Sequence, residues 1–238
     1  MIEKIINGIK YRLDEETKTA EVIKKKGYEG DIIIPEVVVF RKISYRVSSI
    51  GEDAFLGCDS LTSIVIPESV TSIGGGAFYG CASLTSIVIP NGVTSIGQEA
   101  FKYCSSLTSI VIPDSVTSIG GGASEGCSSL SSIVIPDSVT EIRGSAFRGC
   151  SSLTSIVIPD SLTSIGRSAF KYCESLTSIV IGNGVTSIGK QAFDGCDSLL
   201  SITYQGTIEQ WNEIDFGNGW NDEVPTEVIH CTDGDVEI

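Results

Sequence analysis

The chain has 238 residues, of which 41% are hydrophobic and 19% are charged, and its net charge at pH 7 is −14. This apolar content and length suffice for a packed core and exclude a disordered tail. The acidic excess excludes a general attraction for nucleic acid or for anionic membranes. A single histidine disfavours most enzyme chemistry that depends on that side chain. No apolar run approaches the about 20 residues of a membrane span, so no membrane insertion is expected.

The first residues are MIEKIINGIKYRLDEE, in which no basic segment precedes an apolar stretch. We therefore expect no signal peptide. Residues 1–30 carry the alternating segments IKYRL and TAEVI on either side of a polar DEETK. This pattern predicts a β-hairpin that caps the first coil of the array that follows.

An internal repeat dominates the rest of the chain. Six units of 23 residues run without a gap from Leu61 to Ser198, and the first reads LTSIVIPESVTSIGGGAFYGCAS. Residues 31–60 form the same unit with nine extra residues, which indicates an inserted loop at 37–46. In SIVIP the isoleucines alternate with Ser and Val, and this alternation predicts a short strand that ends at Pro. The apolar residues of SVTSIG and AFxxC follow, with Gly permitting the turn between them.

One such unit cannot bury its own apolar residues, whereas stacked units form a continuous core. A period of 23 residues headed by L-x-x-I-x-I lies in the leucine-rich-repeat range. We therefore predict a leucine-rich-repeat solenoid, β-rich and curved, with short helical or 3-10 turns on its convex side. At ~4.8 Å per coil, seven or eight coils would extend about 35–40 Å. The predicted single domain comprises an N-terminal cap at 1–30, repeats at 31–198, and a last partial repeat with an acidic cap at 199–238.

The repeated phrase S-L-T-S-I-x-I-P-x-S-V-T-S-I-G-x-x-A-F-x-G-C resembles the unit of the BspA-like leucine-rich-repeat family. The resemblance covers about residues 31–204, and the segment Q-W-N…W-N…I-H-C-T-D-G is similar to the end of such arrays. It implies a bacterial cell-surface or secreted protein that adheres to host matrix proteins or to other cells. Because no signal peptide is seen, a cytoplasmic protein-interaction scaffold stays open as the alternative.

Seven of the eight cysteines share the repeat register, each three residues after the Phe position of its unit: Cys58, Cys81, Cys104, Cys127, Cys150, Cys173 and Cys196. An even number of cysteines leaves disulfides open as an alternative. Their place in an inward column favours buried free thiols, which pack as small apolar groups. Zinc usually needs C-x₂₋₄-C pairs, and none occurs, so we expect no metal and no cofactor.

The C-terminal segment holds the candidates for catalysis. His230 and Cys231 are adjacent, and neighbours on a strand point to opposite faces, so they are poorly placed as a catalytic pair. No G-x-S-x-G elbow occurs either. We therefore expect no enzyme, with a hydrolase in the C-terminal cap as a less favoured alternative. Residues 199–238 carry nine acidic residues and no Lys or Arg. A solvated cap over the last edge strand is favoured above a calcium or basic-partner site at Asp233 and Asp235.

Two further features concern single columns of the repeat. An acidic or amide residue follows the strand-ending position in each unit, and turn chemistry explains it better than cation binding: Glu68, Asn91, Asp114, Asp137, Asp160 and Asn183. Ser124 occupies the position that is Phe in the other units. We expect a cavity or a water molecule there.

The outward residues of the SIVIP strands are the candidate binding surface, expected on the concave face. They form a serine ladder at positions 63, 86, 109, 132, 155 and 178 and a valine ladder at positions 65, 88, 111, 134, 157 and 180. Extended apolar surfaces of this kind serve repeat proteins in binding, although valine also favours strands on its own account. A rival face carries two tyrosines next to lysines. The predicted partner-binding residues are Ser86, Val88, Ser109, Val111, Ser132, Val134, Ser155, Val157, Tyr103 and Tyr172. The expected partners are host extracellular-matrix or cell-surface proteins, and a monomer is favoured.

Overall fold

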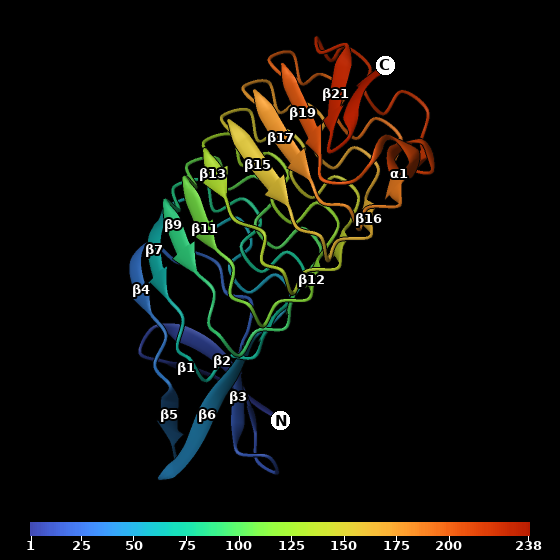
Figure 1. Cartoon of the computed structure of the whole chain (residues 1–238). Helices are drawn as coiled ribbons and strands as arrows, with labels where there is room; N and C mark the ends of the chain where they lie inside the picture. Colours follow the sequence, from blue (N-terminus) through green and yellow to red (C-terminus); the bar gives the residue numbers. More distant parts are fainter.

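The computed structural model describes all residues 1–238, and they form one elongated solenoid with the two termini at opposite ends (Figure 1). One face, which we call the strand face, carries one strand from each coil: β4 (Gly30–Ile33), β7 (Leu61–Val65), β9 (Ser86–Val88), β11 (Ser109–Val111), β13 (Ser132–Ile133), β15 (Ser155–Ile158), β17 (Ser178–Ile181), β19 (Ser201–Tyr204) and β21 (Val228–Cys231). The predicted leucine-rich-repeat solenoid is confirmed. The expected seven or eight coils are wrong, because β21 pairs with β19 in parallel and closes a ninth coil.

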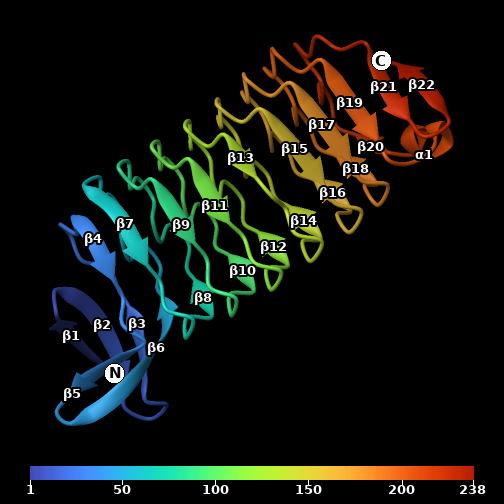
Figure 2. The ribbon, with the colours of Figure 1, turned by 60° about the vertical axis from the view of Figure 1, so that its left-hand side comes forward.

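The second face is a continuous parallel ladder of two-residue strands (Figure 2). In six of them the second residue is a buried isoleucine that points inward, whereas β20 has the partly buried Phe216 at this position. The strands are β8 (Ser72–Ile73), β10 (Ser95–Ile96), β12 (Ser118–Ile119), β14 (Glu141–Ile142), β16 (Ser164–Ile165), β18 (Ser187–Ile188) and β20 (Asp215–Phe216). Since the inward positions repeat every coil, these isoleucines form one column of the core.

The third face, which we call the turn face, consists of successive hydrogen-bonded turns in place of continuous helix. In the first regular unit the N–H of Ala77 donates to Gly74, that of Tyr79 to Gly76 and that of Cys81 to Phe78. The chain cannot continue as a helix because Gly76 and Gly80 have φ of 60° and 71°. The short helical turns that the sequence predicts are therefore separate turns, which still aim Ala, Phe and Cys into the core.

The N-terminal segment forms three antiparallel strands where the sequence predicts two. They are β1 (Ile2–Ile6), β2 (Ile9–Asp14) and β3 (Thr19–Val22). The inserted residues form a second hairpin of β5 (Val37–Phe40) and β6 (Ile43–Ile50), with φ of 51° and 66° at Arg41 and Lys42. Positive φ at both turn residues matches the tight turn that suits twisted strands. Strand β6 pairs with both β3 and β8, so the cap continues the second sheet.

The C-terminal cap is built on one short helix, α1 (Ile208–Asn212), and on β22 (Gly234–Glu237), which pairs with β21. Thr207 and Gln210 form a capping box at the start of α1. Trp211 is buried and lies 5.3 Å from Tyr204 and 5.8 Å from Trp220, measured between ring centroids. These rings close the open end of the core. No helix of the structure is long and apolar enough to cross a membrane.

A column of aromatic rings runs through the core and stops once. Phe55 and Phe78 stack with centroids 5.1 Å apart, and Phe147 and Phe170 stack at 5.5 Å. Tyr28 packs on the first ring and Trp220 on the last. Ser124 is only 3% exposed and occupies the ring position between Phe101 and Phe147, so the stack is interrupted there. The third regular coil therefore contributes no ring to the aromatic column.

We predict that Ser124→Phe stabilises the protein, because the ring would complete the column. The reverse change in the next coil, Phe147→Ser, should cost about 3–5 kcal/mol, the range for truncating a buried Phe. The gain at Ser124 should be smaller, about 1–3 kcal/mol, because a larger side chain placed in an existing core also introduces strain. Thermal unfolding followed by circular dichroism measures both variants. A melting temperature of Ser124→Phe at or below that of the parent chain would show that the neighbours already fill the gap.

Candidate protein-binding face

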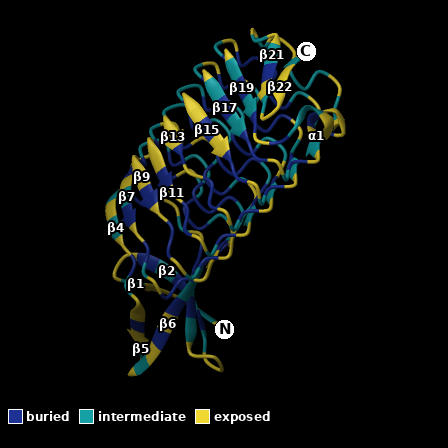
Figure 3. Cartoon of the chain, in the orientation of Figure 1, coloured by how far each residue is buried: buried dark blue, intermediate teal, exposed yellow.

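The outward residues of the strand face form a line of exposed aliphatic side chains. Exposed stretches recur on the strands of this face in Figure 3. Side chains alternate along each strand, so the isoleucines of SIVIP enter the core and the valine between them faces solvent. The valines are 54% to 79% exposed, with Val134 the most exposed, and Ile33 extends the line at 71%. We call this line the valine strip; it comprises Ile33, Val65, Val88, Val111, Val134 and Val157. Val180 is half-buried, and Thr203 and His230 occupy the last two positions.

The predicted serines lie beside the valine strip on the same strands. Ser86, Ser109, Ser132 and Ser155 are all exposed, and the residue pairing places Ser86 next to Ser109 and Ser109 next to Ser132. The hydroxyl residues just before these serines are exposed as well: Thr85, Thr108, Ser131 and Thr154. The eight predicted strand residues therefore form one uncharged surface of methyl and hydroxyl groups. Ile33 belongs to this surface too, and the segment IIIP at 32–35 is its signal in the sequence.

The two predicted tyrosines lie elsewhere, on the turn face. Tyr103 and Tyr172 are 47% and 41% exposed and have φ of 61° and 62°, a conformation that glycine adopts in the equivalent position of other coils. Each ring covers the glycine of the next coil, Gly126 or Gly195, closely enough that a Cβ there would collide with it. The Nζ of Lys171 lies 4.8 Å from the ring of Tyr172. The structure thus separates these tyrosines from the strand residues, and the two sets cannot form one site.

The acidic and amide residues that follow the strand end in each unit do not make the hydrogen bonds that the sequence predicts. The sequence predicts side chains that bond their own turns, but Glu68 and Asp160 instead accept from the backbone N–H of Asn91 and Asn183 in the next coil, at 3.2 and 2.9 Å. Asp114 and Asp137 are exposed and have no hydrogen-bond or ion-pair partner in the chain. Two carboxylates beside the strand face are therefore available to an outside group.

The cysteines of the repeat bind neighbouring coils together as free thiols. The Sγ–H of Cys81 donates to the carbonyl of Phe55 at 3.2 Å, and the next five repeat cysteines make the same bond to the residue 26 positions earlier. Burial raises the pKa of the Cys127 and Cys196 thiols to about 12. Only a thiolate is a good nucleophile, so these cysteines are structural.

The C-terminal His and Asp residues serve the cap. His230 is exposed, and its Nδ1 lies 2.9 Å from Asp235 Oδ1. Asp233 Oδ1 accepts from the N–H of Ile208 at 2.8 Å and so caps helix α1. Burial raises the pKa of the Cys231 thiol, and its side chain is only partly exposed. The structure contains no group of three His, Cys, Asp or Glu side chains placed to hold a metal ion.

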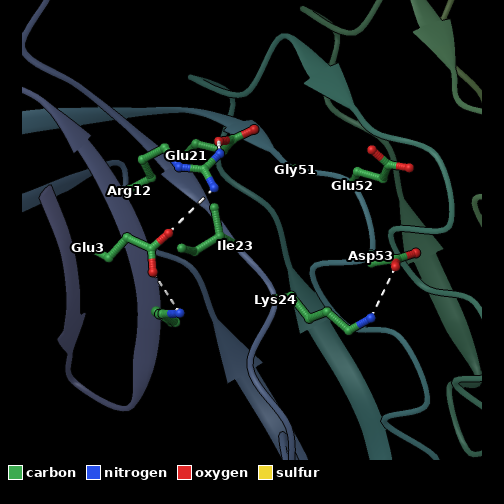
Figure 4. A pocket seen from close by; sticks show the side chains of 9 residues that line it. Glu3, Arg12, Glu21, Ile23, Lys24, Gly51, Glu52 and Asp53 are labelled. Atoms are coloured by element: carbon green, nitrogen blue, oxygen red, sulfur yellow. Dashed lines mark hydrogen bonds and ion pairs between the residues drawn. The ribbon is translucent and has the colours of Figure 1, made fainter. Parts of the chain in front are cut away.

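A charged cavity of about 420 Å³ lies in the N-terminal cap (Figure 4). Its cations are already paired: Lys10 with Glu3 at 2.8 Å, and Arg12 with Glu21 at 2.7 Å. On the far side Lys24 reaches Asp53 at 3.0 Å. The hydrogen bond from Lys10 holds the pKa of Glu3 below its ordinary value. These contacts neutralise the cavity from within, which favours a structural role.

Comparison with known proteins agrees with this architecture. Two solved bacterial leucine-rich-repeat structures share the fold, so the chain is a leucine-rich-repeat protein by structure. The one from Treponema pallidum is 27% identical with a TM-score of 0.61, over 91% of this chain and 86% of that one. The one from Bacteroides ovatus is 29% identical with a TM-score of 0.62, over 97% of this chain and 71% of that one.

The family follows from the repeat itself. The model of the BspA type leucine rich repeat region matches in six copies over residues 38–152 and 123–221, and the chain belongs to this family. The resemblance predicted from the repeated phrase is thereby confirmed. No curated protein matches the chain.

The buried thiols predict a loss of stability in alkali. The pKa of Cys127 is about 12 in the folded chain against an ordinary value of 9.0. Below pH 9 both states hold the proton, so stability does not depend on it. Between these values the unfolded chain loses a proton that the folded chain keeps, and the free energy of unfolding falls by up to about 1.4 kcal/mol per pH unit for each such thiol.

Urea unfolding between pH 8 and pH 11 measures this slope. We expect the free energy of unfolding of Cys127→Ala to fall less steeply with pH than that of the parent chain, by about 1.4 kcal/mol per pH unit, because one titrating thiol is gone. Ser105→Ala, on the same turn face, is the non-titrating control and should keep the parent slope. Equal slopes for Cys127→Ala and the parent would contradict the burial of this thiol.

Proposed function

We propose that this chain is a non-enzymatic protein-binding module that recognises its partner through the valine strip. The observation that carries the proposal is the exposure of six aliphatic side chains in consecutive coils. Contiguous apolar surface is rare on soluble monomers and usually marks an interaction site. Exposed serine and threonine hydroxyls on one side of the strip supply hydrogen bonds at the rim of such an interface.

The shape of the strip supports a protein partner over a small molecule. Strands spaced by ~4.8 Å spread six positions over roughly 25 Å, which is the dimension of a protein interface. Repeat proteins use extended surfaces of this kind for binding. The buried thiols, and a histidine engaged by Asp235 on the surface of the cap, offer no nucleophile-base pair in the repeats. A scaffold function therefore fits these residues better than a hydrolase.

The finer proposal is adhesion at a bacterial surface. The family resemblance implies cell-surface or secreted proteins that contact host matrix or other cells, and both solved relatives described above come from bacteria. We propose that this chain adheres to an extracellular-matrix or cell-surface protein. The runner-up is a cytoplasmic scaffold, whose partner would come from the producing cell.

Binding to immobilised fibronectin and fibrinogen, with albumin as the blank, tests the proposal. We expect saturable binding to at least one matrix protein and at least a tenfold loss in the double variant Val88→Lys/Val111→Lys, because two charges would replace apolar contacts at the centre of the strip. The matched control is Ser72→Lys/Ser95→Lys, which adds the same charge at exposed positions of the second sheet.

The outcomes separate the two parts of the proposal. Binding that the variant Val88→Lys/Val111→Lys keeps, or that the control variant loses equally, would contradict a role for the valine strip. Binding to neither matrix protein would contradict adhesion.

A further inference from the structure

The strand face is interrupted at two places. Its strands form three separate ladders: β4 with β7, then β9 to β13, then β15 to β22. Between β13 and β15, which are neighbours in Figure 2, no ladder pairing is present. In other coils the N–H of Ile34 donates to Val65 at 3.0 Å and that of Ile89 to Val111 at 3.3 Å. The equivalent bond from Ile135 to Val157 is absent, as are those from Ile66 to Val88 and from Ile112 to Val134, so the Ile135 N–H has no partner in the chain.

The loss of pairing between β13 and β15 is confined to the strand face. On the second sheet β14 pairs with β16, and on the turn face the N–H of Phe147 donates to Ala169 at 2.9 Å. At the start of the strands the N–H of Thr154 still reaches Ser131 at 3.4 Å. The two coils are thus held on the other faces, and the separation at β13 and β15 is a local seam.

A cleft of about 450 Å³ opens at the seam. The side chains of Val134 and Val157, two members of the valine strip, line it together with Pro159. Ser132 and Ser155 contribute hydroxyls. Its volume is within the range of pockets that enclose a ligand group. It therefore offers an apolar slot in the middle of an otherwise even surface.

The one charged group that lines the cleft is the carboxylate of Asp137. Asp137 is exposed and unpaired, whereas Asp160 in the next coil is engaged by Asn183. No basic residue lies on the strand face between 61 and 160, because the three in this range belong to the other faces and pair with glutamates: Lys102, Arg143 and Arg148. An aliphatic wall that ends at an unpaired carboxylate complements a side chain with an alkyl stem and a cationic head.

We propose that the seam between β13 and β15 binds a lysine or arginine side chain that a partner protein presents on an extended segment. The stem packs between Val134 and Val157, and the head reaches Asp137. The unpartnered N–H of Ile135 can donate to a backbone carbonyl of that segment, which favours an extended backbone alongside. The inference rests on the proposed function and names the chemistry of the partner.

Three acetylated and amidated heptapeptides test the seam. The first has the sequence Gly-Ser-Thr-Lys-Thr-Ser-Gly, and the others carry glutamate or norleucine in place of lysine. Titration into methyl-labelled protein is followed by NMR. We expect the lysine peptide to shift the methyl signals of Val134 and Val157 and to bind at least fivefold more tightly than the norleucine peptide. The glutamate peptide should bind most weakly.

Asp137→Asn should abolish the preference for lysine over norleucine, because only the cationic head meets this side chain. Asp114→Asn is the matched control, since Asp114 has the same position one coil earlier, is equally exposed and does not line the cleft. Three results would overturn the seam proposal. They are an unchanged preference for lysine in Asp137→Asn, equal affinity for the three peptides, and no shift of the methyl signals of Val134 and Val157.

The matrix-binding assay keeps the two proposals distinguishable. If Val88→Lys/Val111→Lys abolishes matrix binding while the peptides leave the seam signals unmoved, the valine strip stands and the seam inference fails. If the peptides behave as expected while neither matrix protein binds, the seam stands as a site for a basic segment and the adhesion proposal fails.

Discussion

Hydrogen bonds between neighbouring coils impose the 23-residue period on the rest of the molecule. The N–H of Phe78 donates to Ala100 at 2.7 Å, and that of Thr117 donates to Thr94 at 2.9 Å. Because each coil is bonded to the coils on both sides, equivalent residues must stack at the spacing of adjacent strands. An extra segment can be accommodated only by leaving the coil, and the hairpin of β5 and β6 does so.

The stacking makes each side chain part of a column, and every column must begin and end somewhere. Tyr28 starts the aromatic column with its ring 4.7 Å from Phe55, and Trp220 ends it 6.1 Å from Phe193. The same stacking operates at the surface. The outward valine of each unit lies next to the valines of the neighbouring coils, and together they form the valine strip. Core and binding face are therefore two consequences of one register.

The sequence allowed the columns to be predicted because they depend only on period and alternation. The buried Phe and Cys positions and the outward valines follow from a repeat of 23 residues. The ninth coil could not be predicted, since residues 205–231 share no repeated phrase and join the solenoid through the pairing of β20 with β18 and of β21 with β19. Tyr103 and Tyr172 were expected on a rival face and lie there, but the pattern does not show that each ring covers a glycine of the next coil. The seam was also beyond the sequence, as Ser132 and Val134 have the same letters as their neighbours in paired coils.

The hydrogen bonds between neighbouring coils are distributed unevenly over the three faces. This distribution affects where a partner can bind. On the turn face the bond from the Phe position to the Ala of the next coil recurs from Phe55 to Phe170, with Ser124 making it where Phe is absent. The second sheet is likewise continuous from β6 to β20. Only the strand face contains breaks, and the same face exposes the aliphatic strip. A partner that inserts at the seam meets apolar surface without having to displace a ladder bond between β13 and β15. The remaining two faces keep the coils in register while the seam is occupied, so binding there does not oppose the fold.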